Sequence, residues 1–153
     1  MISDTTRSGV SPAASGPAVS IDLEAQPEAP SPTRILLVED NERLRGTTER
    51  LLRLLGYEVS ATAGACEAMA ALEQGQHFDL VFSDVGLPGA MNGVQLVQAM
   101  QARDRELKAV LTSGYSENVD TVGEVDRLRL PMIRKPYRKA DLAACLLAAL
   151  GAG

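Results

Sequence analysis

The chain has 153 residues, of which 45% are hydrophobic and 23% charged, as expected for one globular domain. Its formal charge of −5 at pH 7 argues against a protein that binds the phosphate backbone of nucleic acids. Only 3% of the residues are aromatic and none is tryptophan, so a base-stacking surface for single-stranded nucleic acid is not expected.

The first 32 residues differ from the rest of the chain. They hold four acidic residues and one basic residue, a net charge of −3, and five of the eight prolines but no aromatic residue. The other 121 residues hold 16 acids and 14 bases, a net charge of −2. The early segment cannot bury enough apolar surface to offset the entropy lost on ordering. We therefore predict a disordered tail over 1–32 and a folded domain over 33–151.

The termini and the cysteines bear on the compartment. The first residues lack the basic flank and apolar core of a secretory signal, and the longest apolar run, Leu142–Leu150, is too short to span a bilayer. We therefore expect a cytoplasmic protein without a membrane partner. Cys66 and Cys145 form no CxxC pair, so they are interpreted as buried or half-buried free thiols on opposite faces of the fold, and His77 as an ordinary loop residue.

From residue 33 onward, short apolar runs alternate with helical patterns. In chain order we predict a strand over Arg34–Val38, a helix capped by Asn41 and ended by Gly56, a strand over Glu58–Ala63, a helix over Ala65–Gln74, a strand over Leu80–Ser83, a helix marked by Val94 and Met100, a strand over Ala109–Thr112, a weak β-branched helix within 116–130, a strand over Met132–Arg134 and a helix over Lys139–Leu150. This alternation predicts an α/β fold, a doubly wound parallel sheet of five strands with helices on both faces.

Polar residues follow the carboxyl ends of these strands. Glu39 and Asp40 follow the first strand, Asp84 the third, Ser113 the fourth and Lys135 the fifth. In open parallel sheets these ends meet at one rim, where ligands bind. Three neighbouring carboxylates repel one another and need a cation, and oxygen ligands without His or Cys suit Mg²⁺ or Mn²⁺.

The same rim is suited to phosphoryl transfer. A carboxylate such as Asp84 beside a metal ion can attack phosphorus, while Lys135 and the Ser113 hydroxyl neutralise the phosphoryl oxygens. Gly86, two residues after Asp84, is placed to offer a carbonyl ligand to the metal. Any one of these acids alone would be interpreted as a solvated loop residue, but five residues at the correct strand ends favour a site.

Four segments, LLVEDN, FSDVGLPGAMNG, VLTSGY and RKPY, stand in this order. With them, residues 34–150 resemble a receiver domain of the two-component response-regulator family. The resemblance implies a flavodoxin-like sheet of order 2-1-3-4-5, and a metal held by Glu39, Asp40, Asp84 and the Gly86 carbonyl. It also implies that Asp84 accepts a phosphoryl group from a sensor histidine kinase or a histidine phosphotransfer protein.

Further roles are implied by the same resemblance. Ser113 would be the switch hydroxyl with Thr112 facing the interior, and Lys135 would contact the phosphoryl group and precede a cis peptide bond to Pro136. Met132 stands where the family usually carries an aromatic residue, and Tyr115 is the alternative aromatic reporter of switching.

We therefore expect a signalling receiver without an output domain, which catalyses only its own phosphorylation and dephosphorylation and then binds an unknown downstream protein. Three alternatives stay open. The chain could be a pseudo-receiver adaptor that is never phosphorylated, or the receiver segment of a hybrid histidine kinase. A dehalogenase-type phosphatase is the third, although that family places a second Asp where this chain has Gly86.

Overall fold

A computed structural model describes residues 32–114 and 119–151 of the chain. The predicted tail lies outside the described residues except for Pro32, and so does Tyr115. The predictions made for both stay predictions.

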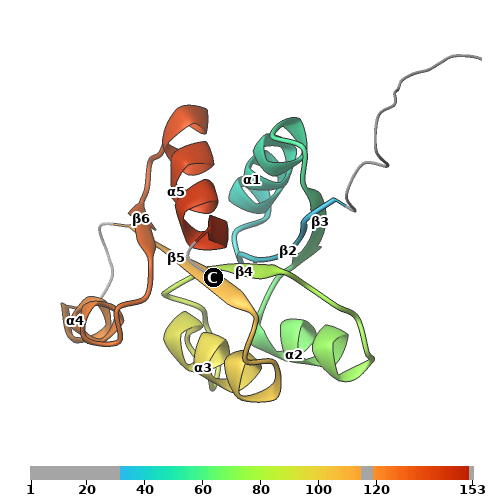
Figure 1. The fold of residues 1–153 in the computed structure, drawn as a ribbon. Helices are drawn as coiled ribbons and strands as arrows, with labels where there is room; N and C mark the ends of the chain where they lie inside the picture. The colour runs from blue at the N-terminus through green and yellow to red at the C-terminus, as the bar shows by residue number, and fades with distance from the viewer. Residues whose placement is uncertain (1–31, 115–118, 152–153) are drawn as a thin grey trace, which may run out of the picture. The chain divides into compact units, whose positions relative to one another are not determined.

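The centre of the fold is a five-stranded parallel sheet (Figure 1). Its strands are β2 (Arg34–Val38), β3 (Glu58–Thr62), β4 (Leu80–Asp84), β5 (Lys108–Ser113) and β6 (Met132–Arg134). They lie side by side in the order β3-β2-β4-β5-β6, which is 2-1-3-4-5 when the strands are counted along the chain. The predicted fold class and strand order are confirmed.

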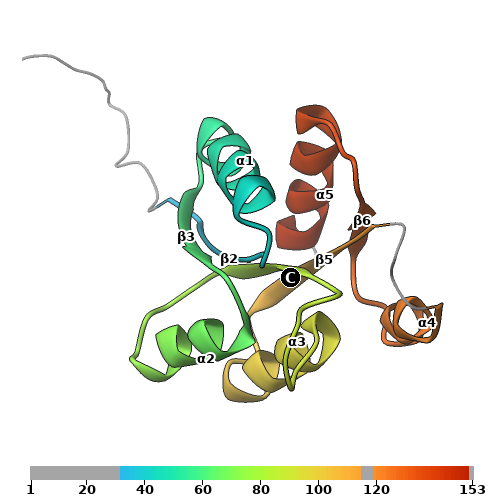
Figure 2. The ribbon, with the colours of Figure 1, turned by 180° about the vertical axis from the view of Figure 1, so that it is seen from behind.

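Helices cover both faces of the sheet. They are α1 (Glu42–Leu54), α2 (Ala65–Glu73), α3 (Gly93–Arg103), α4 (Val119–Arg127) and α5 (Lys139–Gly151). Figures 1 and 2 show α1 and α5 on one face, α2 and α3 on the other, and α4 beside the β6 edge. Cys66 on α2 and Cys145 on α5 therefore lie on opposite faces, and both are free thiols, as predicted. Cys145 is half-buried, but the expected burial of Cys66 is wrong, because this residue lies on the exposed side of α2.

Local sequence signals set the helix ends. The Asn41 side chain accepts a hydrogen bond from the Leu44 amide, which begins α1. Asn92 and Gln95 form a reciprocal capping box at the start of α3. After α1, Gly56 adopts a left-handed φ of 98°, a conformation that glycine enters without steric cost.

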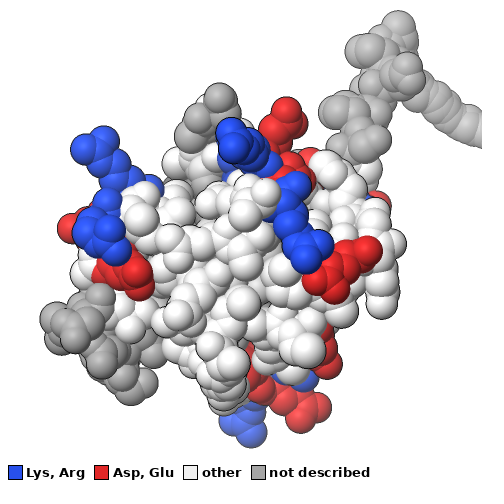
Figure 3. All heavy atoms as spheres, turned by 90° about the horizontal axis from the view of Figure 1, so that it is seen from below, with Lys and Arg blue, Asp and Glu red and all other residues white. Residues whose placement is uncertain are grey.

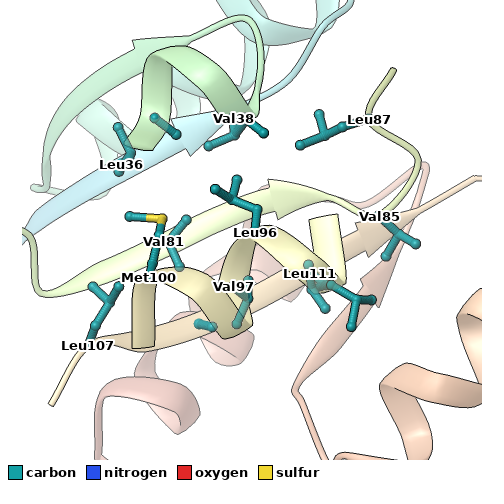
Figure 4. Close-up of a cluster of buried hydrophobic side chains, with 14 of the residues drawn as sticks. Leu36, Val38, Val81, Val85, Leu87, Leu96, Val97, Met100, Leu107 and Leu111 are labelled. Carbon is teal, nitrogen blue, oxygen red and sulfur yellow. The ribbon is translucent and has the colours of Figure 1, made fainter. Parts of the chain in front are cut away.

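The apolar residues of alternate strand positions build two cores. Leu36, Val81 and Leu111 point towards α2 and α3, where Leu96 and Met100 complete a buried apolar cluster (Figure 4). The other face has its own set, contributed by Ile35, Leu37, Leu80, Phe82, Val110, Leu142 and Leu146. Burying each such side chain contributes about 1.5–3 kcal/mol, so the two clusters hold the sheet between its helices.

Helix α4 forms although its sequence is rich in β-branched residues. Val125 is buried in the core and packs the helix against its neighbours. The turn after α4 closes through bonds from the Leu130 amide to the Val125 carbonyl and from the Arg129 amide to the Asp126 carbonyl. Tertiary burial thus outweighs weak helix propensity in this segment.

The strands β4 and β5 extend further than predicted. The prediction ended them at Ser83 and Thr112, whereas the sheet continues to Asp84 and Ser113. Asp84 pairs with Thr112 in the ladder, and the Val85 amide donates to the Thr112 carbonyl. Asp84 and Ser113 are therefore held by rigid strand backbone rather than by loops.

Charge on the surface is mixed. On the face covered by α2 and α3, acidic and basic side chains lie around the margin and do not merge into one basic surface (Figure 3). Among the described residues, no helix is long and apolar enough to cross a membrane.

Candidate functional site

Three carboxylates meet at the carboxyl end of the sheet. Glu39 and Asp40 follow β2, and Asp84 is the last residue of the neighbouring strand β4. One oxygen from each residue lies within 4.8 Å of the others. Glu39 and Asp84 are buried, whereas Asp40 is exposed. The cluster predicted from the strand ends is therefore formed.

Lys135 joins this cluster from the end of β6. Its Nζ lies 3.0 Å from Glu39 Oε1 and 3.3 Å from Asp84 Oδ2, and its side chain is 20% exposed. The Lys135 amide donates to the Ser113 carbonyl at 2.8 Å, which fixes the residue beside the end of β5. A single cation thus bridges two buried carboxylates.

Burial and these contacts shift the ionisation of both partners. Burial, with a smaller contribution from the charge of Asp84, raises the pKa of Glu39 above its usual value, although Lys135 and the Asn41 amide oppose the shift. For Lys135, burial acts to lower the pKa, but the bonds and charges of Glu39 and Asp84 outweigh it and leave the pKa raised. Lys135 therefore remains a cation at neutral pH.

The backbone around Glu39 is held on both sides. Its Oε2 accepts a bond from the Asn41 amide at 3.2 Å, and its carbonyl accepts one from Arg45 Nη1 at 2.9 Å. The Glu39 amide donates to the Thr62 carbonyl of the neighbouring strand. Arg45 was not among the predicted site residues, because nothing in its local pattern distinguishes it from the other cations of α1.

Ser113 brings a buried hydroxyl to the end of β5. The residue is 1% exposed, and its Oγ has no hydrogen-bond partner among the described residues. A buried hydroxyl without a partner costs about 1–3 kcal/mol, which a bound acceptor would recover. Thr112, the preceding residue, is also buried, as its predicted interior position requires.

The loop after Asp84 is tied to the same carboxylate. The Gly86 amide donates to Asp84 Oδ1 at 3.3 Å, and Gly86 itself is exposed. This bond brings Gly86 beside the cluster, and the role of its carbonyl as a metal ligand stays a prediction.

Gly93 supports Asp84 from behind. A Cβ atom at this position would collide with the main-chain carbonyl of Asp84, so only glycine allows α3 to begin this close to β4. The Gly93 amide also donates to the Val85 carbonyl at 2.9 Å. Gly93 was not among the predicted site residues, because a glycine after a helix cap does not by itself indicate a close approach of two backbones.

Tyr137 ties the loop after Lys135 to α1. Its hydroxyl lies 2.9 Å from Thr48 Oγ, and its ring stands edge-on to Phe82, with the ring centroids 6.2 Å apart. Burial raises the pKa of Tyr137. The bond between Lys135 and Pro136 is cis, as the family resemblance implied. The Tyr137 contacts were not predicted, because Thr48 lies far away in the chain.

The donor set suits a hard divalent cation. Glu39, Asp40 and Asp84 offer carboxylate oxygens, and no His or Cys joins their group among the residues that the structure describes. Such oxygen ligands fit Mg²⁺ or Mn²⁺. The unsatisfied Ser113 hydroxyl and the Lys135 ammonium fit an anion bound beside that cation.

Known proteins resemble this chain in sequence. The family model of the response regulator receiver domain matches residues 35–147. The transcriptional regulatory protein PrrA of Mycobacterium tuberculosis is 29% identical over 117 residues, which cover 76% of this chain and 49% of PrrA. The sensor kinase CckA of Brucella abortus is 31% identical over 110 residues, which cover 71% of this chain and 12% of CckA. The chain thus spans about half the length of PrrA and a much smaller share of CckA.

Solved structures of receiver domains have the same fold as this chain. A CheY-like response regulator receiver domain protein from Methanospirillum hungatei is 28% identical with a TM-score of 0.71, and the match covers 80% of this chain and 96% of that one. A receiver protein from Sinorhizobium medicae has a TM-score of 0.72 at 23% identity, covers 80% and 97% of the two chains, and shows the fold alone. The chain belongs to the family of response regulator receiver domains.

Proposed function

We propose that the protein is a phosphoacceptor receiver of a two-component phosphorelay, in which Asp84 takes a phosphoryl group from the phosphohistidine of a sensor histidine kinase or a histidine phosphotransfer protein. The observation that carries the proposal is the convergence at Asp84. A buried carboxylate stands 3.3 Å from the Lys135 ammonium, within a group of three acids and near the end of the strand that carries the unpaired Ser113 hydroxyl.

The transfer is a substitution at phosphorus. A carboxylate oxygen of Asp84 forms the new O–P bond while the P–N bond to the donor imidazole breaks, and the leaving nitrogen keeps the electron pair of that bond. Glu39, Asp40, Asp84 and the Gly86 carbonyl would hold Mg²⁺, which would supply positive charge beside the phosphoryl oxygens when bound. Lys135, whose Nζ lies 3.3 Å from Asp84 Oδ2, supplies a further positive charge beside the carboxylate.

The chain's own residues then respond to the new charge. Phosphorylation adds about −1.5 to −2 charges at Asp84. The Lys135 ammonium, paired with Glu39 and Asp84 before transfer, exchanges a carboxylate contact for a phosphoryl oxygen, and the Ser113 hydroxyl donates to another. Because Ser113 ends β5 and Lys135 follows β6, this rearrangement acts on two adjacent strands.

The cellular role extends the same proposal. We place the receiver in the cytoplasm, acting on its own phosphorylation state rather than on a separate substrate, with a downstream protein as its output. A second candidate is the receiver segment of a hybrid kinase, which the match to CckA, described as a sensor kinase, favours. The match to PrrA, described as a transcriptional regulatory protein, keeps a transcriptional output possible through another part of a longer protein.

The test is incubation of the full chain with acetyl phosphate and Mg²⁺, followed by intact mass measurement. The expected result is a gain of one phosphoryl group that requires Mg²⁺ and is absent in Asp84→Asn. Asp126→Asn, an exposed substitution on α4, is the matched control and should keep the uptake. Uptake retained by Asp84→Asn would refute the site, and a wild-type chain that stays unmodified would identify a pseudo-receiver.

A further inference from the structure

A cavity lies at the opposite end of the sheet from Asp84. It has a volume of about 510 Å³ and opens between the starts of β5 and β6, the end of α3 and the last turns of α5. Its volume falls within the range of roughly 300–1,000 Å³ that is typical of small-molecule sites. None of the residues discussed for phosphoryl transfer lines it.

Three cations line this cavity, which we call the amino-end pocket. They are Arg105 and Lys108 at the approach to β5 and Arg129 before β6. No ion pair involves them within the described part of the chain, although the nearby Arg103 and Arg127 are paired with Glu73 and Glu124.

No acidic residue compensates these charges inside the pocket. The lining contains no Asp or Glu, and the acids on either side of Arg105 in the chain, Asp104 and Glu106, lie outside it. The pocket is thus locally basic on a chain whose net charge is −5. Charge complementarity therefore points to an anion.

Arg129 occupies an unfavourable backbone position. Its φ of 58° lies in the left-handed region, at the turn after α4 where glycine is the usual residue. A side chain there is strained relative to glycine. The sequence nevertheless places a cation at this position, and the side chain borders the pocket. Such an outlier favours a functional use of the residue.

The walls between the cations are apolar. Leu107 and Ala149 are buried, and Leu130 and Met132 are half-buried. Cys145, also half-buried, reaches the same pocket from α5. An apolar lining with cations at its exposed parts matches a ligand that combines an apolar body with a negatively charged group.

We propose that the amino-end pocket binds a small amphipathic anion, an organic carboxylate, sulfonate or phosphate with an apolar body. Arg105, Lys108 and Arg129 receive the charged group, and Leu107, Met132 and Ala149 pack against the apolar part. The site does not depend on the proposed phosphorylation of Asp84, because it shares no residue with that site.

The test uses 8-anilinonaphthalene-1-sulfonate as the probe in a fluorescence titration of the full chain. Saturable binding is expected, and the uncharged analogue N-phenyl-1-naphthylamine should bind about tenfold more weakly or worse, because it lacks the charge that the cations recognise. Arg129→Gly should weaken binding of the anion about fivefold, the loss expected for one charge interaction. Glycine suits the left-handed backbone, so this variant should remain folded.

Arg127→Ala is the matched control, since Arg127 is exposed and lies outside the pocket. Its affinity for the sulfonate should equal that of the wild-type chain. The bound probe should also slow alkylation of Cys145 but not of Cys66, which is exposed on the other face of the sheet. Equal binding of the charged and uncharged probes, or unchanged affinity in Arg129→Gly and Lys108→Ala, would overturn the proposal and identify adventitious binding to apolar surface.

Discussion

At the carboxyl end of the sheet, three acids lie together and two of them, Glu39 and Asp84, pair with the Lys135 ammonium. At the amino end, three cations line a cavity whose lining holds no acid. The acids lie at the ends of β2 and β4 and the lysine follows β6, whereas the three cations of the pocket lie at the start of β5 or on the turns before β5 and β6. The apolar interiors of these strands are alike, so the difference arises from the residues that precede and follow them. The net charge of −5 of the whole chain therefore does not indicate the local charge at either end of the sheet.

The two ends also differ in how firmly their charges are held. Glu39 and Lys135 are bonded to each other and to surrounding backbone, whereas Arg105 and Arg129 are exposed and make no ion pair among the described residues. A preorganised, desolvated cluster suits bond formation at a fixed atom. Exposed cations beside an apolar wall suit reversible ligand binding.

The largest effect on stability is expected from a substitution of Gly93, which packs behind Asp84 at the carboxyl end of the sheet. Gly93→Ala should lower the free energy of unfolding by about 3 kcal/mol, because the added Cβ meets the Asp84 main chain and α3 must shift. Gly46→Ala is the matched control, since Gly46 is exposed within α1 with open space around its Cβ, and should raise stability by about 1 kcal/mol. Urea unfolding measures both, and equal effects would refute the close approach.

Mg²⁺ is expected to bind at the carboxyl end of the sheet and not at the amino end. At a concentration of 100 times its Kd, bound Mg²⁺ should raise the free energy of unfolding by about 2.7 kcal/mol, because it binds the folded acid cluster and not the unfolded chain. Asp84→Asn should lose most of this gain, whereas Arg129→Gly at the other end should keep it. Thermal or urea unfolding with and without Mg²⁺ makes the comparison, and a full response in Asp84→Asn would place the ion elsewhere.

A smaller effect of opposite sign is expected at the amino end. Arg129→Gly should raise the free energy of unfolding by about 1 kcal/mol, because glycine adopts the left-handed backbone without strain. The same variant is expected to lose affinity for the amphipathic anion, so stability and binding should move in opposite directions. A destabilised Arg129→Gly chain would show that the arginine side chain supports the turn instead.

The smallest effect concerns the thiols. Burial raises the pKa of Cys145 above its ordinary value of 9.0, so a smaller fraction is thiolate at any given pH. The alkylation rate of Cys145 should therefore keep rising with pH beyond the point where an ordinary thiol levels off, and exposed Cys66 should react first at neutral pH. Peptide mass measurement after brief iodoacetamide treatment distinguishes the two. Faster reaction of Cys145 would contradict the expected effect of burial on its pKa.

Much of the carboxyl end could be predicted from the sequence because its residues directly follow apolar runs. Parallel strands bring their carboxyl ends to one rim, so Glu39, Asp84 and Lys135 could be placed together without coordinates. The strand ends themselves were less predictable, since Asp84 and Ser113 join the ladder through pairing with neighbouring strands.

Contacts between segments that are distant in the chain could not be predicted from the sequence pattern. The Thr48–Tyr137 bond and the approach of Gly93 to Asp84 depend on how α1 and α3 dock onto the sheet. The amino-end pocket was not predicted from the sequence. The rule for parallel sheets concerns the residues that follow strands, whereas Lys108 begins β5 and Arg105 and Arg129 precede strands.

The most direct test of the central claim is to locate the phosphoryl group on the chain. After reaction with acetyl phosphate and Mg²⁺, reductive trapping of the acyl phosphate with borohydride and peptide fragmentation should mark Asp84 and no other carboxylate. A mark on Asp40 or Glu39 instead would contradict the assignment of Asp84 as the phosphoacceptor.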